Sequence, residues 1–224
     1  MKQLIHREDL HHGGFAGLRE HRIVMHSDIF VHHKEPDTVD GIGSFIYLAD
    51  AKFNPHGQTH MHPHKEVDVI SVMVEGNIKH EGSLEHGSSL KAGDIQVQRA
   101  GGEGFSHNEI NPDATQNRML QLWFAPETSG EKASYQLFNK SQEKVQRIYG
   151  GDDGSTLKSD TIMKVIRLQD QESYHYQGLF QAYLFKGTAH TSNSTLIEGD
   201  FFSDDTLDIQ ASGVCELILI HLKN

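Results

Sequence analysis

Apolar residues in this chain gather in short runs of strand length, separated by glycine and polar turns. Residues 67–74 form one such run, which Gly76 ends, and residues 95–98 alternate apolar and polar side chains. An alternation with a period of two places every second side chain on one face of a sheet. No segment shows the periodicity of a long amphipathic helix. The pattern predicts an all-β chain, with further strands at residues 42–48, 78–80, 119–125, 162–168, 179–185 and 217–222.

A weak internal repeat suggests that one β unit occurs twice. Gly76 follows a strand, and one hairpin later the chain reads Leu-x-x-Gly-Asp at residues 90–94. Gly187 begins a shorter stretch that ends in the same pattern at residues 196–200. Two copies of a β-barrel unit would produce this echo, although two short matches also arise by coincidence.

The composition changes between the two halves. Residues 127–132 are predicted to be a linker or surface loop and residues 150–155 a sharp turn, with more strands after them. We therefore expect two domains, residues 1–130 and 131–224, in a chain whose 224 residues suffice for two small packed units. The polar residues 1–40 are interpreted as an arm or an edge covering.

Charge and composition narrow the function classes. The formal net charge is -11, so we expect no direct binding to nucleic acid, whose phosphates require clustered Lys and Arg. The single cysteine, Cys215, lies in a predicted strand and is expected to be a buried, inert thiol. The first residues lack the apolar core of a signal peptide, and no run approaches a membrane span. A cytoplasmic protein without membrane contact is the default expectation.

Histidine is unusually frequent, with 17 residues, and 14 of them lie at or before His107. Within that region, His62 and His64 form one i, i+2 pair, and His107 and Glu109 form another. On a strand each pair directs two ligands to the same side. Three imidazoles and one carboxylate suit a divalent transition metal.

Spacing alone is weak support for these pairs. At this composition about one H-x-H pair and about one H-x-E pair are expected by chance, and the chain has two and four. Their order along the chain is more specific: H-x-H before an apolar strand, a glycine turn, and a second pair after a Gly-rich loop. This is the order found in cupin β-barrels.

The motifs around these pairs resemble the pirin family, specifically over residues 53–126 and more loosely over residues 178–222. The family pattern runs roughly P-G-x-G-F-x-x-H-P-H-R, E-G, G-D-x-Q, A-G-x-G and H-S-E-x-N-P. The matching residues here are Pro55, His62-Pro63-His64, Glu75-Gly76, Gly93-Asp94-Ile95-Gln96, Ala100-Gly101, His107-Asn108-Glu109 and Asn111-Pro112.

The resemblance implies a bicupin whose first barrel holds one divalent ion through His62, His64, His107 and Glu109. Fe(II) is the first expectation, with Cu, Ni, Mn, Co or Zn as alternatives, and the second barrel is expected to be metal-free. Some family members are reported as quercetin 2,3-dioxygenases. The corresponding expectation is an enzyme that cleaves a flavonol-like substrate with O₂, with Glu109 helping to remove the proton of its 3-hydroxyl. Other members act as redox-dependent regulators, so the alternative is a metal-sensing protein that binds a protein partner.

Several assignments stay open at the level of sequence. His60 and His62 could be the ligand pair in place of His62 and His64, and a cupin that has lost its metal is the alternative for the whole group. His80 either lines the cavity or is exposed. Asp68 and Gln96 are candidates for orienting the ligating imidazoles. The chain departs from the family at Lys65 (Arg), at Asp68 (Glu) and by one extra residue before His107, and these changes bear on the substrate pocket. The doublets His11-His12 and His32-His33 are expected to be exposed.

Overall fold

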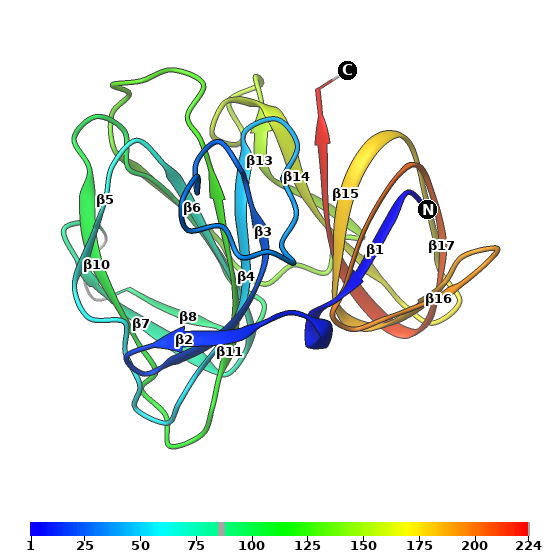
Figure 1. Ribbon diagram of the computed structural model, residues 1–224, viewed down its shortest axis with the longest axis horizontal. Coiled ribbons are helices and arrows are strands. Elements are labelled where there is room, and N and C mark those ends of the chain that lie inside the picture. Colours follow the sequence, from blue (N-terminus) through cyan, green and yellow to red (C-terminus); the bar gives the residue numbers. More distant parts are fainter. Residues whose placement is uncertain (85–87, 224) are drawn as a thin grey trace. The chain divides into compact units, whose positions relative to one another are not determined.

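The computed structural model describes residues 1–84 and 88–223, and it confirms the predicted all-β class. The described residues fold into strands and one three-residue 3-10 helix, Arg7–Asp9 (Figure 1). Within that part of the chain, no helix is long and apolar enough to cross a membrane.

The described chain divides into two compact units. One unit, here called the N-terminal unit, comprises Leu10–Ser141; the other, the C-terminal unit, combines Met1–Asp9 with the residues from Gln142 on. The division into domains 1–130 and 131–224 stays a prediction. The boundaries of the compact units differ from this division in two places. The first nine residues belong to the C-terminal unit, and the N-terminal unit continues to Ser141.

The N-terminal unit consists of two antiparallel sheets (Figure 1). The larger has seven strands in the order β12 (Ser134–Phe138), β9 (Ile95–Arg99), β6 (Asp68–Glu75), β11 (Arg118–Phe124), β4 (Phe45–Phe53), β3 (Leu18–Met25) and β2 (His12–Phe15). The smaller has four: β5 (His62–His64), β10 (Phe105–Ile110), β7 (Asn77–Gly82) and β8 (Ser89–Lys91).

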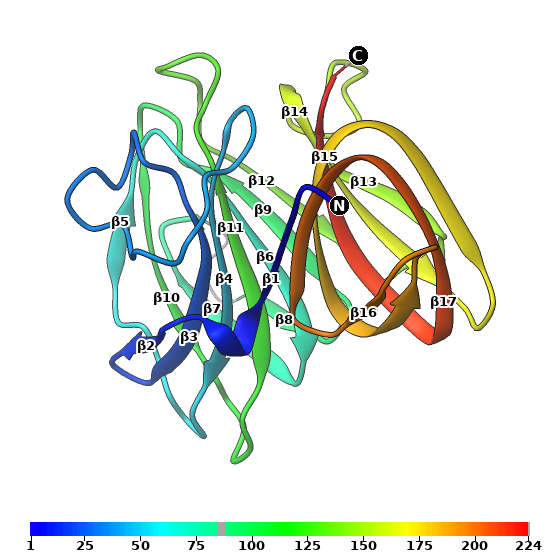
Figure 2. The same ribbon diagram turned by 45° about the vertical axis from the view of Figure 1, so that its right-hand side comes forward.

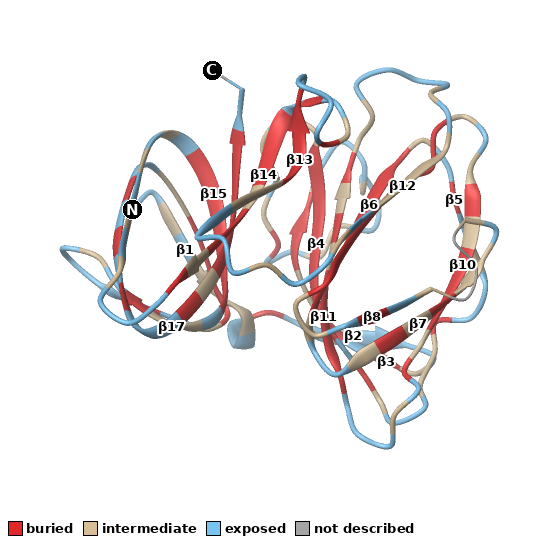
Figure 3. Cartoon of the chain, turned by 180° about the vertical axis from the view of Figure 1, so that it is seen from behind, coloured by how far each residue is buried: buried red, intermediate tan, exposed pale blue. Residues whose placement is uncertain are grey.

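Within the larger sheet, most of the buried side chains belong to three central strands, as the red segments of β4, β6 and β11 show (Figure 3). β6 is buried from Asp68 to Met73, which explains why its sequence is a nearly continuous apolar run. The strands predicted at residues 42–48, 67–74, 95–98 and 119–125 match β4, β6, β9 and β11 to within a few residues.

The interpretation of residues 1–40 as an arm or edge covering is wrong for β3. This strand pairs with β4 along its length, and Ile23, Val24 and Met25 are buried in the core. Its polar start, Arg19-Glu20-His21-Arg22, concealed it from a search for apolar runs. The buried Glu20 is satisfied by Arg22, whose Nη2 lies 2.6 Å from the Glu20 Oε1.

The C-terminal unit is one six-stranded sheet in which two long strands curve strongly (Figure 2). Phe180 pairs with both Asp204 and His221, so β15 lies between two parts of β17. The strands follow the order β13 (Val145–Gly151), β14 (Ser159–Leu168), β17 (Asp200–Leu222), β15 (Ser173–His190) and β16 (Thr195–Ile197), with β1 (Gln3–His6) paired to β17.

The weak sequence repeat corresponds to one local structure that occurs in both units. Gly93 and Gly199 have φ angles of 97° and 98°, a region in which glycine avoids a steric penalty. The aspartate that follows accepts a hydrogen bond from the backbone amide three residues earlier. Lys91 N lies 3.1 Å from the Asp94 carboxylate, and Ile197 N lies 2.8 Å from the Asp200 carboxylate.

Candidate metal centre

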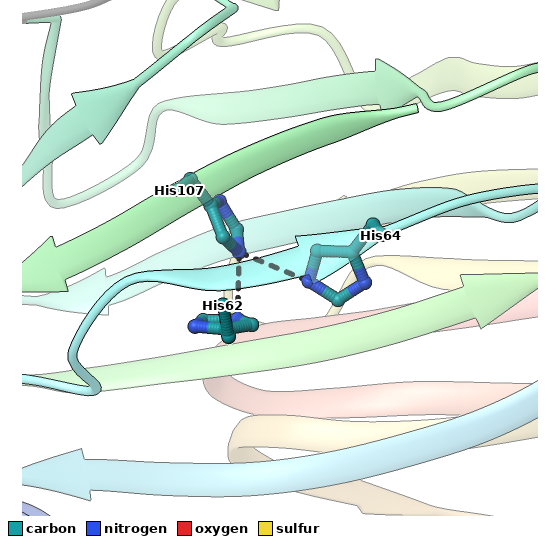
Figure 4. Close-up of side chains that lie close together, drawn as sticks. All are labelled: His62, His64 and His107. Carbon is teal, nitrogen blue, oxygen red and sulfur yellow. Dashed lines mark hydrogen bonds between the residues drawn. The ribbon is translucent and has the colours of Figure 1, made fainter. Parts of the chain in front are cut away.

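The pairing of β5 with β10 brings three of the predicted ligands together. In this antiparallel register His62 lies opposite His107, and His64 lies opposite Phe105. Side chains that face each other across two strands share one face of the sheet. The i, i+2 spacing on each strand therefore directs all three imidazoles to the same side, as Figure 4 shows.

The three Nε2 atoms converge on one point. His107 Nε2 lies 3.0 Å from His62 Nε2 and 3.1 Å from His64 Nε2. Two nitrogens that bind one ion at about 2.1 Å and at right angles to each other are about 3.0 Å apart. The three rings thus have the spacing of neighbouring ligands on one face of a coordination sphere.

A backbone contact sets the tautomer of His62. Its Nδ1 lies 2.8 Å from the carbonyl oxygen of His60, so Nδ1 carries the proton and Nε2 presents its lone pair toward the cluster. The side chain of His60 is exposed, and its backbone is left-handed with φ 64°. The His60 imidazole is therefore outside the cluster, and its carbonyl orients the ligand candidate two residues on.

The pKa values of two of the histidines favour the neutral, metal-binding form. Burial, together with the nearby His62, lowers the pKa of His64 to about 4, although the Glu109 carboxylate opposes that shift. Burial likewise lowers the pKa of His107 to about 3, although the Glu109 carboxylate opposes that shift. Both imidazoles are unprotonated at neutral pH, as metal ligation requires.

The carboxylate of Glu109 is fully buried and is held beside the three imidazoles by other partners. Its Oε1 lies 3.1 Å from Nε2 of His80, which is directly opposite on β7, and 3.5 Å from Oγ of Ser71 on β6. Burial opposes ionisation, but the hydrogen bond from His80 and the nearby histidines outweigh it and lower the Glu109 pKa to about 2. Glu109, His80 and His107 form a second group whose potential ligand atoms all lie within 4.8 Å of one another.

His80 is buried beside Glu109, so the alternative of an exposed side chain is wrong. Only 2% of its surface is exposed, and its Nε2 contacts both Glu109 and the amide of Gln96, the latter at 2.7 Å. Because a carboxylate only accepts, His80 Nε2 donates to Glu109, and the Gln96 side-chain amide packs against the same nitrogen. Gln96 therefore acts on Glu109 through His80.

Asp68 is paired with Arg99. Its fully buried carboxylate receives three hydrogen bonds from the Arg99 guanidinium, at 2.7 to 3.1 Å. Asp68 is buried at the start of β6. The doublets His11-His12 and His32-His33 are exposed, as expected.

The Gly-rich loop before β10 folds closely against β5. Gly104 has a φ of 75°, and a Cβ atom there would lie 2.9 Å from the carbonyl oxygen of His64. Its amide bonds the carbonyl oxygen of Ala100 at 2.9 Å. The position therefore requires glycine for both conformation and space. The loop that holds the extra residue therefore lies directly against β5.

An aromatic surface borders the histidines. The ring of Trp123 lies 5.5 Å from that of His64, edge to face, and stacks on Tyr47 at 4.6 Å and on Phe30 at 6.3 Å. Phe105 lies 5.2 Å from both His64 and His107. The sequence did not reveal this apolar lining, although Phe105 stands two residues before His107 and so shares its face.

Several buried polar atoms on the same inner face have no hydrogen-bond partner among the described residues. They include the donors Trp123 Nε1, Gln121 Nε2 and Gln98 Nε2. Gln121 lies opposite Ser71, and Trp123 lies opposite Val69 and Tyr47, so these side chains point the same way across neighbouring strands. Unpaired buried donors are costly unless a ligand or water satisfies them. The face is thus suited to a ligand rich in hydrogen-bond acceptors.

Comparison with known proteins identifies a matching family model and several relatives of this chain. Residues 15–124 match the family model described as Pirin. A Zymomonas mobilis protein, named as a candidate quercetin 2,3-dioxygenase, is 28% identical over 87% of this chain and 88% of its own length. The quercetin 2,3-dioxygenase of Escherichia coli K12 is 34% identical, and that match spans about half of each chain, 51% and 52%.

Two crystal structures of the bacterial pirin YhhW from Escherichia coli share the fold. One superimposes with a TM-score of 0.85 at 21% identity and covers 98% of this chain and 97% of that one. The other, a complex with nickel(II), has a TM-score of 0.84 at 20% identity and covers 99% of both. These likenesses of fold confirm the predicted bicupin architecture.

Proposed function

Because the chain is a pirin-family protein, with its pirin domain at residues 15–124, we propose that it is a metal-dependent dioxygenase that cleaves flavonols such as quercetin with O₂. The observation that carries the proposal is the convergence of the Nε2 atoms of His62, His64 and His107 at 3.0 to 3.1 Å, beside a buried carboxylate. The relatives named for this activity support the choice of substrate class.

The proposed ligands of the ion are His62, His64, His107 and Glu109. Three neutral imidazoles and one carboxylate suit Fe(II), and the same set accepts Ni, Cu, Mn, Co or Zn. The nickel(II) complex of YhhW supports nickel as a serious alternative to iron. A bound ion would supply an electrophilic site that lowers the pKa of a substrate hydroxyl.

Glu109 is the proposed base for the 3-hydroxyl of the flavonol. Its carboxylate is ionised at neutral pH and can accept a proton at the oxygen that the His80 hydrogen bond leaves free. His80 and Ser71 hold the Oε1 atom, so the carboxylate keeps one orientation and Oε2 remains for the ion or the substrate hydroxyl. In this scheme His80 and Gln96 position Glu109.

Trp123 and its neighbours are the proposed binding surface for the aromatic rings. The stack of Phe30, Tyr47 and Trp123 supplies flat apolar faces next to His64. The unpaired donors Trp123 Nε1 and Gln121 Nε2 can bind the carbonyl and hydroxyl oxygens that a polyphenol carries. The surface would also exclude water from the reacting bond.

The test measures two signals on one sample. Tag-free protein is loaded separately with Fe(II), Ni(II) or Zn(II), and O₂ consumption is followed together with the loss of flavonol absorbance. We expect both signals with at least one redox-active ion, unchanged activity in the His33→Ala control and loss of activity in Glu109→Ala. If protein with stoichiometric metal consumes no O₂ with several flavonols, the dioxygenase proposal is wrong. A metal-sensing role through a protein partner would then be the function to test.

A further inference from the structure

The C-terminal unit holds a polar cluster that the metal centre does not use. Lys164 on β14 and His221 on β17 share the inner face of the sheet with the buried core residues Ile166 and Leu219. Tyr176 on β15 reaches the same place. Its ring lies 4.8 Å from that of His221, and the Lys164 Nζ lies 6.0 Å from the ring centre.

One polar atom of this cluster is buried without a hydrogen-bond partner among the described residues, the Nε2 atom of His221, and the other two side chains are half-buried beside it. His221 is 5% exposed; its Nδ1 lies 2.8 Å from the carbonyl oxygen of Leu222, and its buried Nε2 has no partner. The Lys164 ammonium has no ion pair or hydrogen bond to any described residue, and the Tyr176 hydroxyl has none either. Buried or half-buried donors of this kind are normally satisfied.

The charge that acts on the Lys164 ammonium is that of another cation. Burial lowers the pKa of Lys164, and the charge of Arg147, its cross-strand neighbour, acts in the same direction. Burial also lowers the pKa of His221. The Arg147 guanidinium is bound by Asp153, whereas no described carboxylate offsets the charge of Lys164. A negatively charged ligand would supply the missing partner.

The chemistry of each group defines such a ligand. Lys164 calls for an anion. His221 donates through Nδ1 to a carbonyl, so its neutral ring offers Nε2 as an acceptor for a hydroxyl proton. The half-buried rings of Tyr174 and Tyr176 pack against the core and offer apolar faces. We infer that the C-terminal unit binds a small phenolic carboxylate, with the carboxylate on Lys164 and the phenol on His221.

Calorimetry tests the inference on the full-length, metal-free protein, so that the ligand cannot bind through an ion in the N-terminal unit. The probes are 2-, 3- and 4-hydroxybenzoate. Two matched compounds serve as controls: benzoate lacks the phenolic hydroxyl, and hydroxybenzyl alcohol lacks the negative charge. We expect at least one hydroxybenzoate to bind. Lys164→Met should weaken binding about tenfold or more, which is the scale of one charge-assisted hydrogen bond. Lys164→Arg should retain it.

Two variants and one spectroscopic measurement complete the design. Lys186→Met, an exposed lysine paired with Glu216 in the same unit, should leave binding unchanged. His221→Phe should abolish the preference for hydroxybenzoate over benzoate. In tyrosine-labelled protein, the added ligand should shift the ring signals of Tyr174 and Tyr176, which avoids any dependence on how the variants fold. The inference is overturned if no isomer binds, if Lys164→Met binds as well as Lys164→Arg, or if the shifts occur at other tyrosines.

Discussion

His62, His64 and His107 illustrate how far residue spacing predicts a site. Their i, i+2 positions on two strands were sufficient to expect that the imidazoles share one face, and the structure brings the Nε2 atoms of His62 and His64 within 3.1 Å of the Nε2 atom of His107. Spacing did not indicate that Glu109 is held by His80. That contact depends on the register of β7 against β10, two strands that do not follow each other along the chain.

Metal content is the residue-scale prediction that tests the ligand set. His62→Ala and Glu109→Ala should each reduce the bound metal to about a tenth or less of the unmodified protein, since even residues that only orient ligands change affinity 10- to 100-fold. His33→Ala is the matched control, because that imidazole is exposed and outside the cluster. Elemental analysis of tag-free protein provides the measurement, and equal metal in all three variants would contradict the assignment.

The depressed histidine pKa values predict acid sensitivity of the metal-free protein. His107 has a pKa of about 3 when folded, against an ordinary value of 6.5, so the unfolded state binds more protons between these pH values. Stability therefore rises with pH through this window and falls on acidification. We expect the free energy of unfolding to fall by about 1–2 kcal/mol between pH 6.5 and pH 5 for this residue alone.

A non-titrating variant isolates that contribution. Urea unfolding at several pH values should show a smaller pH dependence in His107→Gln than in His33→Gln, which alters an exposed histidine. Identical slopes for the two variants would mean that His107 titrates normally in the folded state.

At the scale of elements, the loop from Ala100 to Gly104 controls the position of β5 relative to β10. Gly104→Ala should destabilise the protein by about 1–3 kcal/mol, since it combines a positive φ with a Cβ contact of 2.9 Å to the His64 carbonyl. It should also weaken metal binding by displacing His64. Gly130→Ala is a close control because φ is 79° there and nothing lies within 4 Å of the added atom.

Thermal unfolding and metal titration of both glycine variants provide the comparison. Gly130→Ala should show only the conformational penalty and normal metal affinity. A metal affinity for Gly104→Ala equal to that of Gly130→Ala would show that the loop does not position His64.

Element prediction succeeded where burial produced an apolar signal and failed where polar pairs replaced it. β6 and β11 were predicted because nearly all of their residues are buried. β3 was missed because its first half contains Glu20 and Arg22, which satisfy each other inside the protein. The three-residue strand β5 has no apolar pattern at all, and only the family motif indicated it.

At the scale of the whole molecule, the chain provides a separate probe for each unit. Trp123, the only tryptophan, lies in the N-terminal unit, and the buried Cys215, the only cysteine, lies in the C-terminal unit. All four proposed ligands belong to the N-terminal unit. A ligand that binds only the folded state stabilises it in proportion to the logarithm of its concentration above Kd.

We therefore predict that added metal shifts the unfolding transition seen by Trp123 fluorescence more than the transition seen by thiol labelling of Cys215. At a free concentration of 100 times Kd, the stabilisation of the N-terminal unit should be about 2.7 kcal/mol. Equal shifts of the two transitions would show that the units unfold together. A shift only at Cys215 would exclude the proposed site.

The pairing of β1 with β17 has a consequence for the order in which the chain can fold. β17 runs from Asp200 to Leu222, and the entire N-terminal unit separates it from β1 along the chain. During synthesis, residues 10–141 can complete their own sheets early, whereas β1 must wait until its partner strand leaves the ribosome. Until then the edge of β1 is unpaired and open to association with other nascent chains, a hazard of long-range strand pairing.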